Sequence, residues 1–290
     1  MKNIVFCGGD KRELPVMAAL LEHGYKVYAY GCPKGLLPSG IISIDDVSGE
    51  FPMADICILP QTPVGKDGSI ASLCSVPVRL DVRDLEKLRA NTPVLCGAAS
   101  VYLRQAAKQC RIIEMAENDD LAMKLAPASA EGAIAEAFKL TGGLLAGQRA
   151  LVIGYGRIGR EIAWRLKGLG VEVLIYNRGT KRAEEAADSG FAVADKSQFV
   201  SAVLYADVIF NTAPALLLDG NILGMMREDA CIVDVAAAPG GTDFDAAVRR
   251  GIKAIHAGGL PGKYAPLYAG RVMAEYYPAF IDRLLKGGDS

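Results

Sequence analysis

The sequence has few histidines, almost no net charge and no long hydrophobic run. It contains two histidines, 32 basic residues and 33 acidic residues in a chain of 290. Two histidines and no Cys-x-x-Cys pair leave little material for a zinc site or a Ser-His-Asp triad, which favours metal-independent chemistry. The balanced charge provides no overall field that would recruit nucleic acid or an anionic membrane surface. The apolar runs are short and strand-like, far below the roughly 20 residues that a membrane span requires.

Cysteine is scattered along the chain without a pattern. The seven cysteines are odd in number, and Cys7, Cys57, Cys96 and Cys231 lie within or beside apolar runs, so we expect reduced thiols in a core. The chain also passes from Met1 directly into an apolar strand, without a charged and then apolar leader that ends in small residues. These features predict a soluble, cytoplasmic protein that binds small molecules.

Apolar runs alternate with helical patterns in both halves of the chain, which predicts two α/β domains. The first is expected to contain a parallel, flavodoxin-like sheet, with a long loop at residues 60–77. Its predicted strands are residues 4–7, 27–30, 56–59, 93–96 and 111–113. A linking helix over residues 130–141, with Ser129 as its N-cap, leads into the second domain. The predicted strands there are residues 151–153, 173–176, 208–211, 232–235 and 254–256.

The predicted fold class is α/β, with two Rossmann-like, doubly wound parallel-sheet domains and a cleft between them. Residues 1–126 are expected to form a flavodoxin/Rossmann-like substrate domain, and residues 127–266 an NAD(P)-binding Rossmann domain. A final helix, residues 267–287, is expected to pack back on the first domain. Because ligands of such sheets bind outside the carboxyl ends of the strands, we expect the functional residues in the turns that follow them.

The strongest motif is Gly154-Tyr155-Gly156-Arg157-Ile158-Gly159, which directly follows an apolar strand and opens a helix. A lone Gly-x-Gly-x-x-Gly is a weak signal, but this context is typical of a dinucleotide-binding fingerprint. Gly154 permits a tight turn, Gly156 lets a pyrophosphate approach the backbone, and Gly159 allows close packing of helix on strand. The helix start adds N–H groups and a positive dipole, so the loop is predicted to bind a dinucleotide.

The end of the next strand distinguishes NAD from NADP. An NAD enzyme usually has Asp or Glu there for the ribose 2′-hydroxyl, whereas this chain reads Tyr176-Asn177-Arg178-Gly179-Thr180-Lys181-Arg182. Arg178 is placed to pair with a 2′-phosphate, and Thr180, Lys181 and Arg182 offer further donors beside Asn177. NADP is therefore the predicted cofactor, with NAD as the alternative. A turn at Asn211-Thr212-Ala213-Pro214 is expected over the ribose and nicotinamide.

Three segments are candidates for binding and transforming a substrate. In Gly8-Gly9-Asp10-Lys11-Arg12, free backbone N–H groups and Arg12 are expected to bind a carboxylate. The second segment is Pro239-Gly240-Gly241-Thr242-Asp243-Phe244. Thr242 is expected to cap a helix and to form a capping-box-like pair with Asp245, and the double glycine is expected to leave an open anion site. After the last strand, Lys263 is placed to neutralise an acidic substrate and His256 to transfer a proton. Glu131, at the predicted start of the linking helix, is a second candidate base that also suits the helix dipole.

Taken together, these blocks resemble the family of the dipicolinate synthase A subunit over nearly the whole chain. The resemblance rests on Gly8-Gly9-Asp10 with Arg12, Ala130-Glu131-Gly132-Ala133-Ile134, the loop at 154–159, Asn211-Thr212 with Pro214, Pro239-Gly240-Gly241-Thr242-Asp243-Phe244, and Gly259-Leu260-Pro261-Gly262 with Ala265-Pro266 and Ala269-Gly270. The last two blocks are the most specific. In the family, Ser-Lys often precedes the Pro-Gly-Gly block and Thr precedes Ala-Gly, whereas this chain has Ala237-Ala238 and Tyr268.

The resemblance implies oxidation of dihydrodipicolinate, from a branch of the lysine (diaminopimelate) pathway, to dipicolinate (pyridine-2,6-dicarboxylate) for sporulation. It also implies the flavoprotein-like B subunit of dipicolinate synthase as partner, and the mother-cell cytoplasm of a spore-forming bacterium as location. A dicarboxylate needs two cationic or N–H-rich pockets, for which the candidates are Gly9, Asp10, Arg12, Gly241, Thr242 and Lys263. Transfer of a hydride to NADP and of a proton to His256 or Glu131 would leave an aromatic ring, so a modest base suffices.

We also expect the protein to form a homo-oligomer. Two alternative functions stay open. One is another dehydrogenase. A D-2-hydroxyacid dehydrogenase would need an Arg and a His-Glu pair around the carbonyl, and usually an acidic residue that binds the ribose. A shikimate dehydrogenase would share the loop that binds the ribose, but it needs a substrate lysine motif that the first half of this chain lacks. The other is a non-catalytic protein, either a nucleotide-binding scaffold or a redox sensor.

Overall fold

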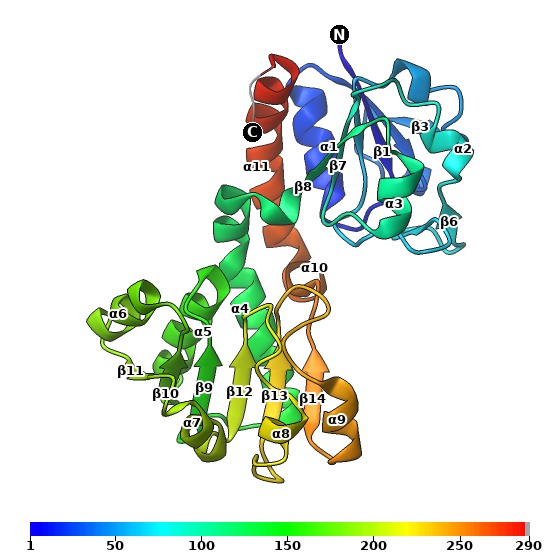
Figure 1. The fold of residues 1–290 in the computed structure, drawn as a ribbon. Coiled ribbons are helices and arrows are strands. Elements are labelled where there is room, and N and C mark those ends of the chain that lie inside the picture. The colour runs from blue at the N-terminus through cyan, green and yellow to red at the C-terminus, as the bar shows by residue number, and fades with distance from the viewer. Residues whose placement is uncertain (288–290) are drawn as a thin grey trace. The chain divides into compact units, whose positions relative to one another are not determined.

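The protein folds into an α/β structure with two six-stranded parallel sheets (Figure 1). The computed structural model describes residues 1–287. Its contacts divide the chain into a first unit, Met1–Leu125 with the segment that begins at Ala265, and a second unit, Ala126–Tyr264. The predicted class of two doubly wound parallel-sheet domains is confirmed. No helix within residues 1–287 is long and apolar enough to cross a lipid bilayer.

The sheet of the first unit has the strand order β3-β2-β1-β4-β7-β8. Its strands are β1 Asn3–Cys7, β2 Lys26–Tyr30, β3 Ile42–Ile44, β4 Ile56–Ile58, β7 Pro93–Cys96 and β8 Arg111–Glu114. The five strands predicted from the sequence do take a flavodoxin-like order, but β3 adds a strand beyond β2 and gives the Rossmann order. Of the predicted flavodoxin/Rossmann-like domain, the Rossmann-like form is therefore confirmed and the flavodoxin-like sheet was wrong. The sequence did not reveal β3 because it has only three partly exposed residues and no continuous apolar run.

Helices cover both faces of this first sheet. Ile4 and Phe6 of β1 pack on one face with α1 (Glu13–Glu22) and α11 (Pro266–Leu285). The alternate residues, Val5 and Cys7, pack on the other face with α2 (Val82–Leu85) and α3 (Val101–Ala106), as the two-residue period of a strand requires. Three short 3-10 helices complete the unit: η1 Lys34–Leu36, η2 Phe51–Met53 and η3 Met115–Glu117.

The segment predicted as a long loop, residues 60–77, contains one short strand. β5 (Ser69–Ile70) pairs antiparallel with β6 (Val78–Arg79) just after the segment. The next residue, Ala71, accepts a hydrogen bond from the Gly9 amide at 2.8 Å. The loop therefore closes over the turn that follows β1.

The linking helix is longer than predicted. α4 spans Asp119–Thr141, with Pro127 inside it, and the boundary between the two units falls after Leu125. Asn118 caps its first turn by accepting the Leu121 amide at 3.0 Å. The prediction of Ser129 as N-cap was therefore wrong. A proline usually marks the start of a helix, because it lacks the N–H that an interior position donates, and here the helix continues through it.

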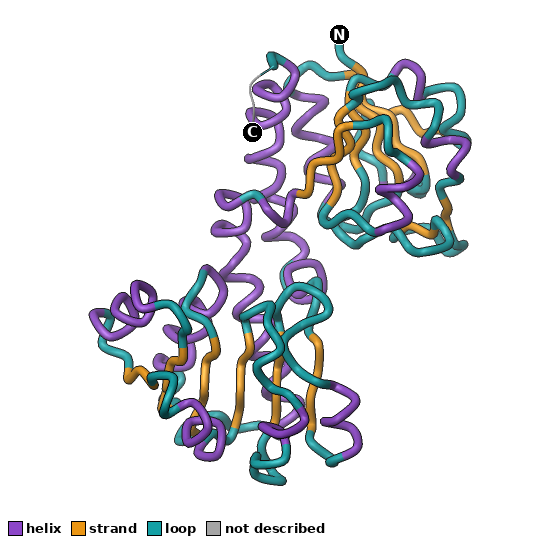
Figure 2. Tube along the Cα trace, in the orientation of Figure 1, coloured by secondary structure: helices purple, strands orange, loops and turns teal. Residues whose placement is uncertain are grey.

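The second unit has the same Rossmann order, β11-β10-β9-β12-β13-β14 (Figure 1). Figure 2 shows these strands in orange and the helices of the unit in purple. Its strands are β9 Arg149–Ile153, β10 Glu172–Tyr176, β11 Ala192–Ala194, β12 Val208–Asn211, β13 Cys231–Asp234 and β14 Lys253–His256. Its helices after α4 are α5 Arg157–Gly168, α6 Thr180–Asp188, α7 Phe199–Tyr205, α8 Gly220–Leu223, α9 Phe244–Arg249 and α10 Leu260–Tyr264. The strand order reverses between β9 and β12, so the binding crevice of this fold lies at the carboxyl ends of those two strands.

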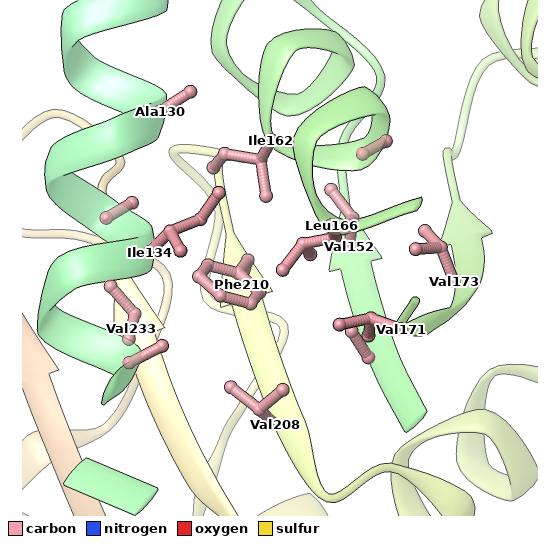
Figure 3. Close-up of a cluster of buried hydrophobic side chains, with 14 of the residues drawn as sticks. Ala130, Ile134, Val152, Ile162, Leu166, Val171, Val173, Val208, Phe210 and Val233 are labelled. Carbon is pink, nitrogen blue, oxygen red and sulfur yellow. The ribbon is translucent and has the colours of Figure 1, made fainter. Parts of the chain in front are cut away.

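One hydrophobic cluster holds β9 and β12 against α4 and α5 (Figure 3). Phe210 of β12 lies at its centre, with Ile134 of α4 and Leu166 of α5 around it, and all three are buried. Full burial of each such side chain contributes about 1.5–3 kcal/mol. This packing fixes the carboxyl ends of β9 and β12, on which the functional residues lie.

Candidate functional site: a dinucleotide crevice at the β9–β12 edge

The turn between β9 and α5 holds its glycines for steric reasons. A Cβ on Gly154, whose φ is +94°, would lie 2.4 Å from Thr212 Oγ1, and a Cβ on Gly159 would lie 2.0 Å from the Gly154 carbonyl oxygen. Gly156 occupies the N-cap of the twelve-residue helix α5 and has no side chain with which to cover the first N–H groups. A close-fitting turn in front of an open helix start fits a pyrophosphate group.

A cavity of about 530 Å³ lies beside this turn. The residues that line it are Ile153, Gly154, Tyr176, Asn177, Arg178, Gly179, Lys181, Arg182, Ala213, Pro214, Ala215 and Leu217. They follow the carboxyl ends of β9, β10 and β12, where the strand order reverses, and they include three cations and no carboxylate. The cavity therefore has the position of a Rossmann nucleotide site and the charge to hold an anionic group.

Two side chains connect the β10 end of the cavity to the glycine loop. Asn177 Oδ1 accepts a hydrogen bond from the Tyr155 amide at 3.1 Å, and Asn177 Nδ2 donates to the Gly179 carbonyl at 2.8 Å. The guanidinium of Arg182 reaches over the loop, with Nη1 3.3 Å from the position of a Cβ on Gly156. Arg182 thus lies where the pyrophosphate of a dinucleotide would rest.

The turn after β12 is shaped by its own polar side chains. The fully buried Asn211 donates from Nδ2 to the Ala213 carbonyl at 3.1 Å and accepts the Ala213 amide at 3.2 Å. Thr212 Oγ1 donates to the Ile153 carbonyl at 2.9 Å. These bonds join β12 to β9 and present Ala213 and Pro214 to the cavity.

The predicted cofactor residues divide into those that line the cavity and those that shape it. The lining set is Gly154, Asn177, Arg178, Arg182, Ala213 and Pro214. Tyr155 and Ile158 belong to the core behind the loop, and Thr180 is an exposed residue at the start of α6. Sequence reasoning missed Ile153 and Tyr176, although each is the last residue of an apolar strand before a predicted binding turn.

The segment 239–244 does not form the predicted open anion site. Gly241 N donates to Asp234 Oδ2 at 2.8 Å, and Thr242 Oγ1 donates to the same oxygen at 2.7 Å. The N-cap of α9 is Asp243, which accepts the Ala246 amide at 2.9 Å, so the predicted Thr242 cap and its box with Asp245 were wrong. The physical reason is the fully buried carboxylate of Asp234, which takes the donors that the loop offers.

His256 ends β14 and is exposed at the same edge of the sheet as the cavity. Its Nε2 lies 2.9 Å from the Ala236 carbonyl oxygen, and its ring centroid lies 5.9 Å from that of Phe244. Within residues 1–287, no cluster of His, Cys, Asp or Glu side chains is arranged to hold a metal ion.

Lys263 is held by a buried carboxylate of α4. Its Nζ pairs with Glu136, which is 4% exposed and also accepts from Tyr264 Oη at 2.6 Å and from Lys139 Nζ at 3.5 Å. Although burial opposes it, the hydrogen bonds from Lys263 and Tyr264 hold the pKa of Glu136 below its ordinary value. Lys263 would have to leave Glu136 to neutralise a substrate.

Glu131 does not lie in a first turn. It is in the middle of α4, and its exposed carboxylate accepts from Arg165 Nε at 3.2 Å. The predicted interaction with the helix dipole was wrong, because α4 begins at Asp119 and the dipole effect is confined to the end turns.

In the first unit, the turn after β1 is closed by its own hydrogen bonds. The Gly8 and Gly9 amides donate to carbonyl oxygens of other segments, and the Arg12 amide donates to Asp10 Oδ1 at 2.8 Å. The Arg12 guanidinium, only 7% exposed, also binds Asp10, with Nη2 2.7 Å from Oδ2. The prediction of free N–H groups here was wrong, and Arg12 would have to exchange Asp10 for a substrate carboxylate.

Glu13 is the ionisable residue of this turn that the sequence reasoning missed. It is 2% exposed, its Oε2 accepts the Asp10 amide at 2.7 Å, and its Oε1 has no hydrogen-bond partner among the described residues. Burial, followed by the negative charge of Asp10, raises the pKa of Glu13 from 4.5 to about 7. The spacing of Asp10 and Glu13, three residues apart before an apolar run, is the signal that could have identified it.

Both halves of the chain match known protein families. Residues 3–116 match the N-terminal domain of the dipicolinate synthase A subunit, and residues 122–242 match the NAD binding domain of D-isomer specific 2-hydroxyacid dehydrogenases. The dipicolinate synthase A subunit of Bacillus subtilis (strain 168) is 30% identical over 278 residues, which is 94% of this chain and 93% of that protein.

Solved structures agree with the sequence matches. The dipicolinate synthase A subunit from Bacillus halodurans is similar with a TM-score of 0.89 and 29% identity, over 98% of this chain and 97% of that chain. The A chain of dipicolinate synthase from Bacillus subtilis is similar with a TM-score of 0.87 and 27% identity, over 99% of this chain and 97% of that chain. The similarity thus extends over both units.

Proposed function

The chain belongs to the family of the dipicolinate synthase A subunit, and from that premise we propose that it oxidises dihydrodipicolinate to dipicolinate for sporulation. Its second unit is a dehydrogenase-type NAD-binding domain, so its chemistry is that of an oxidoreductase with a nicotinamide dinucleotide. The observation that carries the proposal is the glycine turn with its adjoining cavity, in a chain that matches this family over 94% of its length.

The cofactor that we propose is NADP. Besides Arg182, which lies over the glycine loop, Arg178 and Lys181 line the cavity, and neither is in an ion pair within residues 1–287, so their charge is available to a phosphate at the ribose. Hydrogen bonds to a charged group contribute about 1.5–3 kcal/mol each, which corresponds to about 10- to 150-fold in affinity. Positive charge at the ribose end therefore favours the 2′-phosphorylated dinucleotide.

Calorimetric titration with NADP and NAD tests the cofactor proposal. Arg178→Asp should weaken NADP binding by about 10- to 150-fold and reverse the preference. Arg182 lies against the glycine loop, so Arg182→Ala should weaken both dinucleotides alike. Lys196→Asp, an exposed position outside the cavity, is the control and should leave the ratio of affinities unchanged. An unchanged ratio in Arg178→Asp would exclude contact of Arg178 with the phosphate.

The reaction removes one hydride and one proton from the dihydropyridine ring. With a dinucleotide bound, the nicotinamide ring supplies the hydride acceptor. The aromatic product makes proton loss easy, so one exposed imidazole, His256 at the same sheet edge, suffices as acceptor. Lys263 is proposed to bind a substrate carboxylate by leaving its present partner, Glu136. For Arg12, in the first unit, the proposed role is also to bind a carboxylate, by leaving Asp10.

The flavoprotein-like B subunit of dipicolinate synthase is the proposed partner. The test mixes the chain with NADP and enzymatically generated dihydrodipicolinate, with and without this partner, and follows the absorbance of reduced cofactor. Reduction by the chain alone would show a complete dehydrogenase, and reduction only with the partner would show a shared site. No reduction under either condition would refute the proposed oxidation and favour a nucleotide-binding scaffold.

A further inference from the structure

Three polar residues stand in register across the carboxyl edge of the second sheet. Asn211 of β12 pairs with Asp234 of β13, and Asp234 pairs with His256 of β14. Asn211 and Asp234 are fully buried, whereas His256 is exposed. The buried carboxylate of Asp234 is thus next to His256, the proposed proton acceptor, although no step of the proposed oxidation uses it directly.

Asp234 organises the backbone that follows β13. Its Oδ1 accepts the Ala236 amide at 3.0 Å, and its Oδ2 accepts the Gly241 amide and the Thr242 hydroxyl at 2.8 and 2.7 Å. A Cβ on Gly240, whose φ is +85°, would lie 3.1 Å from Oδ2, so the backbone lies close against the carboxylate. Hydrogen bonds to a carboxylate are among the stronger ones in proteins, and here they anchor the backbone at Ala236 through its amide.

The carbonyl group of the same residue, which belongs to the next peptide group, determines the state of His256. The Ala236 carbonyl oxygen lies 2.9 Å from His256 Nε2, and a carbonyl only accepts, so in this bond the hydrogen is on Nε2. A neutral imidazole carries one ring hydrogen, which leaves Nδ1 with a free lone pair. Phe244, tilted at 54° to the imidazole, lies beside the ring.

We propose that Asp234 is a positioning residue, which acts through the backbone of Ala236 to keep His256 in the Nε2–H tautomer with Nδ1 as the proton acceptor. The inference rests on the proposed oxidation. There, a bound nicotinamide would accept a hydride from one C–H bond of the dihydro ring. A second ring bond to hydrogen would give its proton to Nδ1 and its electron pair to the aromatic ring, and the resulting imidazolium would release the proton to solvent. The hydrogen bond from Nε2 to the Ala236 carbonyl is retained throughout, because Nε2 carries a hydrogen in both the neutral and the protonated ring.

The test reads the tautomer directly in the full chain. Only two histidines are present, so His23→Gln identifies the His256 signals in a protein labelled with ¹⁵N-histidine. Long-range proton–nitrogen correlation then shows which nitrogen carries the hydrogen. We expect Nε2–H in the unsubstituted protein, and Nδ1–H there would overturn the proposal without any variant.

Two variants separate positioning from general loop structure. Asp234→Ala removes the acceptor of the Ala236 amide, and we expect mixed tautomers, at least about a ten-fold lower kcat and unchanged cofactor affinity. Thr242→Val removes one donor to Oδ2 but keeps the bond from Ala236 to Oδ1, so the Nε2–H tautomer should persist. If Asp234→Ala also keeps that tautomer, Asp234 does not position His256. The tautomer is read without turnover, so the two proposals can fail separately. If the spectra are as expected but no dihydrodipicolinate is oxidised, the proposed reaction is refuted and the positioning of His256 by Asp234 is supported.

Discussion

Replacing Glu13 with glutamine should stabilise the first unit above neutral pH. Glu13 is 2% exposed, and one of its oxygens has no hydrogen-bond partner within residues 1–287. Burial and then the charge of Asp10 raise its pKa from 4.5 to about 7, so the folded protein retains a proton that the unfolded chain has lost. Glutamine imitates the protonated acid, because it keeps one acceptor for the Asp10 amide and carries no charge.

The sign and size follow from proton linkage. Below pH 4.5 Glu13 is protonated in both the folded and the unfolded state, so it does not lower the free energy of unfolding. Between pH 4.5 and about 7 the folded state binds more protons than the unfolded state, so the free energy of unfolding falls as the pH rises. Each pH unit costs about 1.4 kcal/mol, which over this window amounts to about 3 kcal/mol. Glu13→Gln does not titrate, so its advantage should grow from nothing near pH 4.5 to about 3 kcal/mol above pH 7.

Hydrogen exchange measures the stability of the first unit separately from that of the second. The single tryptophan, Trp164, lies in the second unit, so its fluorescence serves as an internal reference that should not change. Exchange of the β1 amides, Asn3–Cys7, reports the opening free energy of the first unit. Glu22→Gln, at the exposed end of the same helix, is the matched control. Equal protection of Glu13→Gln and the unsubstituted protein at both pH 5 and pH 8 would refute the reasoning.

Three further substitutions test the second unit. Gly159→Ala would bring a Cβ within 2.0 Å of the Gly154 carbonyl oxygen, so dinucleotide affinity should fall at least about ten-fold in calorimetry; unchanged affinity would contradict the close packing. Tyr155→Phe removes a buried hydroxyl without a partner among the described residues, so urea denaturation should show a gain of about 1 kcal/mol; a loss would reveal a partner. Glu136→Gln keeps an acceptor oxygen but removes the negative charge that pairs with Lys263, so stability at pH 7 should fall by about 1–1.5 kcal/mol. The difference should shrink in acid as the lowered pKa of Glu136 is passed; a constant difference would show that its charge contributes nothing.

The local features of this chain could be read from its sequence. In the turn at Gly154, backbone and side-chain atoms approach so closely that only glycine fits. The glycine motif in the sequence therefore predicts the conformation of this turn. The strands of both sheets appear as short apolar runs because both of their faces are buried. The three residues of β3 escaped prediction because an edge strand needs neither a long run nor two apolar faces.

Only the tertiary structure decided which charged groups are available to a ligand. The sequence places Arg12 and Lys263 as free cations, but the fold gives each a carboxylate, Asp10 or Glu136. It likewise gives the loop donors near Thr242 to Asp234. The physical reason is that a buried charge must be paired or hydrogen-bonded, and burial and partners depend on contacts between distant segments that no local pattern records.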